Sequence, residues 1–146
     1  MKIALACSAG GHLTEIRQLE EAYSRHKHFF VTFKRDDSIE LRNAHYIEDP
    51  KRSLLKLAKN IAQSLVVFLR ERPDVVMTTG AGVAVPFCYI AKIFGKKIIY
   101  LESYCRIERP SITGRALYRI SDVFLVQWEE LLEKYGGKAR YWGRLL

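Results

Sequence analysis

The sequence contains little cysteine and no recognisable metal-binding pattern. Its 146 residues include three cysteines, Cys7, Cys88 and Cys105, with no Cys-x-x-Cys pair and no histidine at metal-ligand spacing. This argues against a zinc site or a disulfide framework and favours reduced thiols in the cytosol. We expect Cys7 and Cys88 to lie in the core and Cys105, in a polar segment, to be exposed. No metal ion and no organic cofactor is expected.

Long apolar runs, internal repeats, low-complexity segments and linkers are also missing. The longest strongly apolar stretch without a charge, Ile61 to Leu69, is far shorter than the roughly 20 residues that a membrane-spanning helix needs. The apolar run after Lys2 is too short for a signal peptide, and it leads directly into a glycine-containing turn. We therefore expect one domain over residues 1–146 that works in the cytoplasm.

Acidic residues are fewer than basic ones. The formal net charge is +8, from 24 Lys and Arg against 16 Asp and Glu, and the excess is spread along the chain. A basic surface suits an anionic partner, such as a membrane surface, a phosphate-bearing substrate or nucleic acid. Nucleic acid is the weakest of these, because the aromatic residues lie in predicted strands and are not interleaved with Lys and Arg.

Apolar runs that predict strands alternate with stretches of helical spacing. The predicted strands are residues 3–7, 29–33, 44–47, 74–77, 97–101 and 122–126, with residues 141–143 as a candidate edge strand. The predicted helices are residues 13–23, 53 to about 72, 81 to about 94, 112–120 and 129–134. This alternation predicts an α/β fold: a single Rossmann-like domain with a doubly wound, mostly parallel sheet.

Two glycine-containing turns connect a predicted strand to a predicted helix. Their sequences are Ser8-Ala9-Gly10-Gly11-His12 and Thr78-Thr79-Gly80-Ala81-Gly82. Such turns lie at the carboxyl edge of a parallel sheet, where ligands bind, and free N–H groups at a helix start favour a phosphate. The candidate phosphate- or acceptor-binding residues here are Ser8, Gly10, Gly11, Thr79, Gly80 and Gly82. The alternative is a purely structural role, because tight turns need glycine and neither turn matches a nucleotide-binding fingerprint.

Two ionisable side chains lie at the same predicted edge. His12 follows the first turn, and Glu102 follows the strand at residues 97–101. We expect His12 to be a general base, because imidazole side chains exchange a proton near neutral pH. Glu102 is the second candidate for that base, or alternatively a group that orients the acceptor or His12.

A basic segment follows Glu102. It contains Ser103, Arg106, Arg109 and Arg115, and guanidinium groups match phosphate oxygens in their geometry. We expect these residues to contact a diphosphate or a lipid headgroup. The alternative is a solvated loop in which acidic neighbours, including Glu102 itself, neutralise some of the arginines.

The helix predicted over residues 53–72 is basic and amphipathic. A helix of this kind can lie in a membrane interface. The expected membrane contacts are Leu54, Lys56, Lys59, Ile61 and Phe68. The alternative is an ordinary helix that covers the sheet and exposes a basic face to solvent.

Three stretches of the sequence carry a family resemblance. They are Ser8 to Glu15, Thr79 to Pro86, and Tyr100 to Trp128. In these stretches the chain resembles the Alg14 family, which includes the bacterial polysaccharide-synthesis proteins called PssD, and the likeness runs from Met1 to about Gly143. The family is similar to the N-terminal, acceptor-side domain of GT-B glycosyltransferases such as MurG, whose glycine-histidine loop and strand-end glutamate resemble His12 and Glu102.

The resemblance implies one half of an enzyme. It implies an acceptor-binding, membrane-recruiting subunit of a two-component inverting glycosyltransferase, assembled with an Alg13/PssE-like donor-binding subunit. The complex would transfer a sugar, with GlcNAc as one candidate, from a UDP-sugar to a polyprenyl-diphosphate-linked glycan at the cytoplasmic face of a membrane. Eukaryotic members have an N-terminal membrane-spanning helix that this sequence does not contain, so we expect peripheral attachment. The alternatives are a non-catalytic membrane scaffold that recruits the catalytic partner and a basic nucleotide- or RNA-binding module.

Overall fold

One parallel sheet organises the chain. The computed structural model describes residues 1–145. Its strands are β1 (Lys2–Cys7), β2 (Lys27–Thr32), β3 (Ala44–Tyr46), β4 (Val75–Gly80), β5 (Lys97–Leu101), β6 (Val123–Val126) and β7 (Ala139–Tyr141). They lie in the order β3-β2-β1-β4-β5-β6-β7, and all neighbouring strands are parallel. The predicted α/β fold with a parallel sheet is confirmed.

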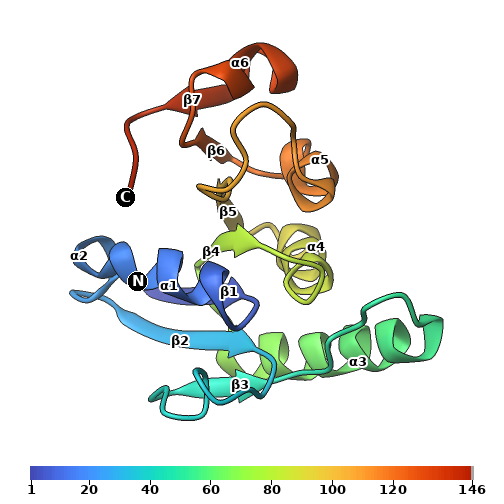
Figure 1. The fold of residues 1–146 in the computed structure, drawn as a ribbon. Helices are drawn as coiled ribbons and strands as arrows, with labels where there is room; N and C mark the ends of the chain where they lie inside the picture. The colour runs from blue at the N-terminus through green and yellow to red at the C-terminus, as the bar shows by residue number, and fades with distance from the viewer. Residues whose placement is uncertain (146) are drawn as a thin grey trace.

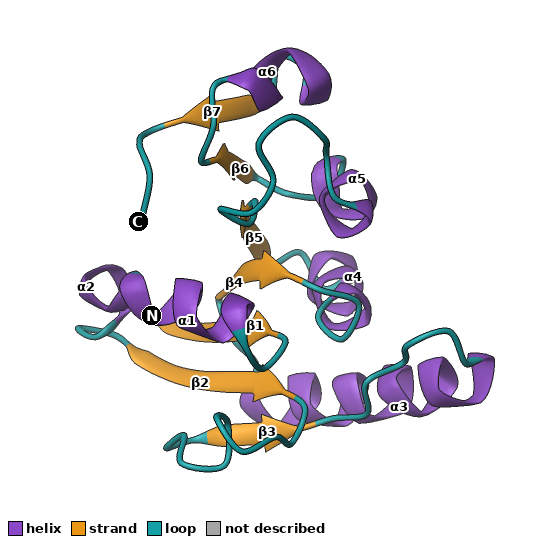
Figure 2. Cartoon of the chain, in the orientation of Figure 1, coloured by secondary structure: helices purple, strands orange, loops and turns teal. Residues whose placement is uncertain are grey.

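Helices cover both faces of the sheet. The helices α1 (Gly11–Gln18) and α2 (Glu20–Tyr23) lie on one face, and α3 (Leu54–Glu71), α4 (Val85–Ile93) and α5 (Ile112–Tyr118) lie on the other (Figure 1, Figure 2). The last helix, α6 (Glu130–Tyr135), contributes Leu131 to the core that α3, α4 and α5 cover. Among residues 1–145, no helix is both long enough and apolar enough to cross a membrane.

The strand order reverses between β1 and β4. From β1 the chain moves outward to β2 and β3, and β4 then lies on the opposite side of β1. The helices that follow these two central strands, α1 and α4, lie on opposite faces of the sheet (Figure 1). In an open α/β sheet such a reversal leaves a crevice at the carboxyl ends of the strands, where ligands bind. Both glycine-containing turns border this crevice.

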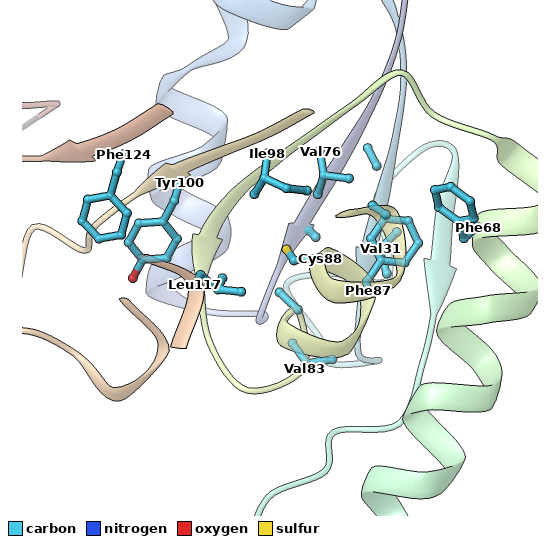
Figure 3. Close-up of a cluster of buried hydrophobic side chains, with 14 of the residues drawn as sticks. Val31, Phe68, Val76, Val83, Phe87, Cys88, Ile98, Tyr100, Leu117 and Phe124 are labelled. Carbon is cyan, nitrogen blue, oxygen red and sulfur yellow. The ribbon is translucent and has the colours of Figure 1, made fainter. Parts of the chain in front are cut away.

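Alternate residues of the strands enter two separate cores. In β1, Ala6 faces the larger core and Leu5 faces the smaller core beneath α1. Phe68, Phe87 and Leu117 bring α3, α4 and α5 into the larger core (Figure 3). Because the central strands are buried on both faces, their sequences are continuous apolar runs instead of alternating ones.

The cysteines lie where the sequence predicts them. Cys7 and Cys88 are buried, and Cys105 is exposed. Burial raises the pKa of the Cys7 and Cys88 thiols to about 12 each. A thiol reagent in solution therefore reaches Cys105 first.

Several element boundaries differ from the prediction. Strand β4 continues through Gly80, and α4 begins at Val85 instead of near Ala81. The reason is the backbone, because Gly80 (φ 98°) and Ala81 (φ 79°) have positive φ angles that a right-handed helix excludes. The helix predicted over residues 13–23 is divided into α1 and α2 at Leu19, and the edge strand predicted at residues 141–143 ends at Tyr141.

The exposed side of α3 carries many apolar side chains, but one of the predicted membrane contacts, Phe68, is not among them. Phe68 is only 2% exposed, and its ring centroid lies 6.2 Å from that of Phe87. This corrects the prediction that Phe68 contacts a membrane, because position 68 shares the sheet-facing side of the helix with Asn60 and Ser64. The exposed large apolar residues of α3 are Leu54, Leu55, Ile61, Leu65, Val66 and Leu69. The helix thus covers the sheet with one side and presents an apolar surface on the other.

Candidate functional site

A cavity of about 430 Å³ opens at the carboxyl edge of the sheet. Its walls come from α1, the turn after β4, the end of β5 and the segment that leads into α5. The lining residues are Gly11, His12, Glu15, Ala81, Tyr100, Ser103, Cys105, Arg106, Ser111, Ile112 and Thr113. A cavity of similar volume, about 440 Å³, lies around Lys34 and Glu48 but contains no histidine. The first cavity is therefore the candidate site, because it combines His12 with the strand reversal.

The first glycine turn presents only its second half to this cavity. Gly10 has φ 89° and lies immediately before α1, and its N–H donates to Asp37 Oδ2 at 2.5 Å. The carboxylate of Asp37 thus holds the position next to this amide that an anion would take. Within the described chain, Gly11 and His12 line the cavity, whereas Ser8 and Gly10 are not among its lining residues.

The second glycine turn is held by bonds within the chain. Ala6 pairs with Thr78 and Cys7 pairs with Gly80, so Thr79 is an extra residue in β4, a β-bulge. The hydroxyl of Thr79 donates to the His12 carbonyl at 2.9 Å, and the N–H of Gly80 donates to Thr78 Oγ1 at 3.0 Å. These groups join β4 to α1 and shape the turn. Gly82 lies outside this cavity, beside Pro50.

His12 has an unused ring nitrogen. It is the second residue of α1, and its side chain is half-buried at the cavity wall. Its Nδ1 is buried and has no hydrogen-bond partner among residues 1–145. A buried ring nitrogen without a partner is uncommon, and this one is available for a hydrogen bond to a neighbouring group.

Glu102 lies beneath the cavity and is bonded on both oxygens. It is 1% exposed. Its Oε1 accepts hydrogen bonds from the Tyr100 hydroxyl and from the N–H of Ser103, each at 3.0 Å. Its Oε2 accepts from the N–H and the hydroxyl of Ser111, at 3.2 and 2.9 Å, and from the Tyr135 hydroxyl. The carboxylate therefore joins β5, α5 and α6, and it lies outside the cavity lining.

The surroundings of Glu102 include two phenols, Tyr100 and Tyr135, to which sequence reasoning gave no role. Burial, and then the adjacent carboxylate, raise the pKa of both Tyr100 and Tyr135, so these phenols stay protonated as donors. At Gly114 a Cβ atom would lie 2.6 Å from Glu102 Oε2, so a larger residue there would displace side chains of this hydrogen-bonded cluster. No local sequence signal identifies Tyr135, because it reaches Glu102 only after α6 packs against the sheet.

The basic segment is divided by the structure. Arg106 lines the cavity, whereas Arg109 and Arg115 are exposed outside its lining. Within residues 1–145, no ion pair joins these three arginines to Glu102 or Glu108. Within the described residues the structure thus lacks the ion pairs of the alternative interpretation, but it leaves the arginines exposed to solvent, as that interpretation also expects.

Glu15 is a residue of the cavity to which the sequence analysis gave no role, although it ends the first family motif. It is only 4% exposed and lies three residues after His12 on α1. Its Oε1 accepts from the Ser103 hydroxyl at 2.8 Å and from the Tyr104 N–H at 3.1 Å. The spacing of three residues was the available signal, because it places both side chains on one face of a helix.

Comparison with solved structures identifies the fold. The chain superposes on MurG from Acinetobacter baumannii with a TM-score of 0.77, at 12% identity over 97% of this chain and 45% of that one. It superposes on the UDP-GlcNAc 2-epimerase of Methanocaldococcus jannaschii with a TM-score of 0.76, at 16% identity over 99% of this chain and 46% of that one. The chain thus spans less than half the length of these GT-B-like proteins, and the shared part is a Rossmann-like unit.

Comparison of sequences identifies the family. The chain is 31% identical to the mouse protein named UDP-N-acetylglucosamine transferase subunit ALG14, over all of this chain and 83% of that protein. It is 28% identical to the Saccharomyces cerevisiae protein of the same name, over all of this chain and 77% of that protein. The family model described as "Oligosaccharide biosynthesis protein Alg14 like" matches residues 39–145. The chain is therefore a member of the Alg14 family.

Proposed function

We propose that the chain is the acceptor-binding, membrane-recruiting subunit of a two-component inverting glycosyltransferase. Its partner is an Alg13/PssE-like subunit that binds the UDP-sugar, and the acceptor is a polyprenyl-diphosphate-linked glycan. The observation that carries this proposal is the open cavity that His12 lines at the carboxyl edge of the sheet, in a chain whose fold matches part of the GT-B-like structures. The chain supplies one wall of an interdomain cleft, and the word "subunit" in the names of the relatives supports a second chain as the source of the other wall. The names of the relatives support GlcNAc as the sugar.

His12 is the proposed general base. It takes the proton of the acceptor hydroxyl, whose oxygen attacks the anomeric carbon while the bond to UDP breaks and UDP leaves with the electron pair. Attack from the face opposite to UDP inverts the anomeric centre. Of the two candidate bases we favour His12, because all the hydrogen bonds of Glu102 hold the loop and the helices around the cavity. In this proposal Glu102 holds Ser103 and Ser111, which line the cavity, in place.

The diphosphate is proposed to lie between α1 and the loop after β5. Gly11 lies at the first position of α1, and Arg106 faces the same cavity. A helix start and a guanidinium group together suit a phosphate, and no metal ion is required by these residues. Arg109 and Arg115 lie further out, where they suit the rest of the acceptor or the partner subunit.

Binding to the isolated chain tests the acceptor assignment. The probe is alkylation of Cys105, which is exposed and lines the cavity, while Cys7 and Cys88 are buried. A short-chain polyprenyl-diphosphate GlcNAc should slow this alkylation several-fold, and UDP-GlcNAc at the same concentration should not. The Cys105→Ser variant is the control, because it should lose the rapidly alkylated thiol. Protection by UDP-GlcNAc alone, or by neither compound, would contradict the assignment.

The exposed side of α3 is the proposed membrane contact, at the cytoplasmic face. Leu54 and Ile61 lie on this apolar surface, 83% and 46% exposed. Lys56 and Lys59 lie beside it and pair with Glu48, with Lys59 Nζ 2.9 Å from Glu48 Oε2. Because these lysines are partly neutralised, we expect apolar burial to contribute more to binding than charge.

Vesicle co-sedimentation tests this contact. Leu55 and Val66 are 86% and 64% exposed on α3. Changing both to Ser should weaken binding to anionic vesicles at least about tenfold, because each buried aliphatic side chain contributes about 1.5–3 kcal/mol. The matched control is Ile39→Ser, which removes a 52% exposed apolar side chain from the loop after β2. Unchanged binding of the α3 variant would assign the attachment to another surface.

A further inference from the structure

We infer that Glu15 is a positioning residue for His12, with Glu15 Oε2 accepting a hydrogen bond from the Nδ1–H of the imidazole. The inference rests on the proposed function, in which His12 is the base. Its basis is two buried atoms that lack a hydrogen-bond partner within residues 1–145: His12 Nδ1 and Glu15 Oε2. Such orphans are uncommon, and these two lie in the same cavity wall.

The helix brings the two side chains together. Residues three apart on an α-helix are neighbours on its surface, so His12 and Glu15 share one face of α1. Their hydrogen-bonding capacities are complementary, because an imidazole N–H donates and a carboxylate oxygen accepts. A side-chain rotation that pairs them satisfies both orphan atoms at once.

The second oxygen of Glu15 holds the carboxylate in place. Its Oε1 accepts from the Ser103 hydroxyl at 2.8 Å and from the Tyr104 N–H at 3.1 Å. Two donors from the loop after β5 thus fix one side of the carboxylate, while Oε2 is left free. A carboxylate that is only 4% exposed needs such partners, and one free oxygen indicates a partner that is still to be bound.

The pairing gives His12 a defined role in the transfer. With Nδ1 protonated and bonded to Glu15, the neutral ring has its lone pair on Nε2, which then accepts the proton of the acceptor hydroxyl. As the acceptor oxygen bonds to the anomeric carbon, the bond from that carbon to UDP breaks and UDP takes the electron pair. Glu15 stays unprotonated and stabilises the imidazolium that forms. Ser103 acts in turn by holding Glu15.

The tautomer of His12 tests the pairing without any activity assay. The full chain is labelled with 15N-histidine, and the His12→Ala spectrum identifies the His12 ring signals by NMR. In the wild-type chain, at a pH where the ring is neutral, we expect the proton on Nδ1. In Glu15→Gln this preference should be lost, whereas Glu20→Gln, an exposed carboxylate on α2, should leave the signals unchanged. A wild-type ring protonated on Nε2 would overturn the inference, and this outcome depends on no variant folding.

Turnover of the complex with the donor-binding subunit supplies the second readout. Glu15→Gln should lower kcat by about 10- to 100-fold, less than the 10²–10⁴ that the whole general base supplies, while KM for the UDP-sugar stays within about threefold. A fall in kcat with an unchanged His12 tautomer would also overturn the pairing, since Glu15 would then act on the substrate directly. If the tautomer shifts as expected but the wild-type complex is inactive, the pairing stands and the proposed function fails.

Discussion

Glu102→Ala is expected to destabilise the folded chain by about 3–5 kcal/mol. The carboxylate is 1% exposed and accepts hydrogen bonds from Tyr100, Ser103, Ser111 and Tyr135. Its removal leaves buried donors without this acceptor, and it removes the bond that joins Tyr135 of α6 to Glu102. Because the stability of a domain is only about 5–15 kcal/mol, such a loss is a large fraction of the total.

Urea unfolding followed by tryptophan fluorescence measures this effect. Glu102→Gln keeps the volume and one acceptor oxygen, so its loss should be smaller. Glu108→Ala is the matched control, because Glu108 is exposed on the same loop and its removal should change stability by less than about 0.5 kcal/mol. If Glu102→Ala is as stable as the control, the buried role is wrong and Glu102 returns as a candidate base.

His12→Ala is expected to have the largest effect on activity. Loss of a general base lowers kcat by about 10²–10⁴-fold, which corresponds to roughly 3–5 kcal/mol of transition-state stabilisation. The variant should fold normally, because the His12 side chain is only half-buried and the inferred bond to Glu15 is its single polar contact at the cavity wall. The bond from Thr79 to the His12 carbonyl remains, since it uses the backbone.

Steady-state kinetics of the complex measure kcat and both KM values for this variant. KM for donor and acceptor should stay within about threefold, because the base acts in the transition state. His26→Ala, which changes a histidine between α2 and β2 away from the cavity, should match the wild type. A loss below about tenfold would remove the base assignment from His12, and a large fall in Tm would make His12 a structural residue instead.

Much of the fold follows from local patterns in the sequence. Continuous apolar runs predict the buried strands, and Ser53 caps α3 as expected, with its hydroxyl accepting from the Lys56 N–H. The predicted start of α4 was wrong because Ala81 has a positive φ angle. That angle follows the β-bulge at the end of β4, and the bulge depends on how β4 pairs with β1. Phe68 was misplaced because α3 is apolar on most sides, and only packing decides which side meets the sheet.

The site was less predictable than the fold, because its chemistry depends on long-range contacts. The sequence places His12 and Glu102 at one sheet edge, and the structure does so too. The sequence does not reveal that Ser111 and Tyr135 enclose Glu102, because these residues lie 9 and 33 positions further along the chain. It also cannot tell that Asp37 bonds to the N–H of Gly10, since this contact depends on the loop after β2.

Reconstitution of sugar transfer from purified components tests the central claim most directly. Each reaction contains UDP-GlcNAc and a polyprenyl-diphosphate-linked acceptor in vesicles. The protein added is this chain, the donor-binding subunit or both, and the glycosylated lipid is then quantified. We expect no product from either subunit alone, product with inverted anomeric configuration from both together, and a loss of about 10²–10⁴ in rate when the complex contains His12→Ala. Full turnover by this chain alone, or undiminished turnover by a complex that contains His12→Ala, would contradict the account; the second result would leave this chain as a membrane scaffold for a catalytic partner.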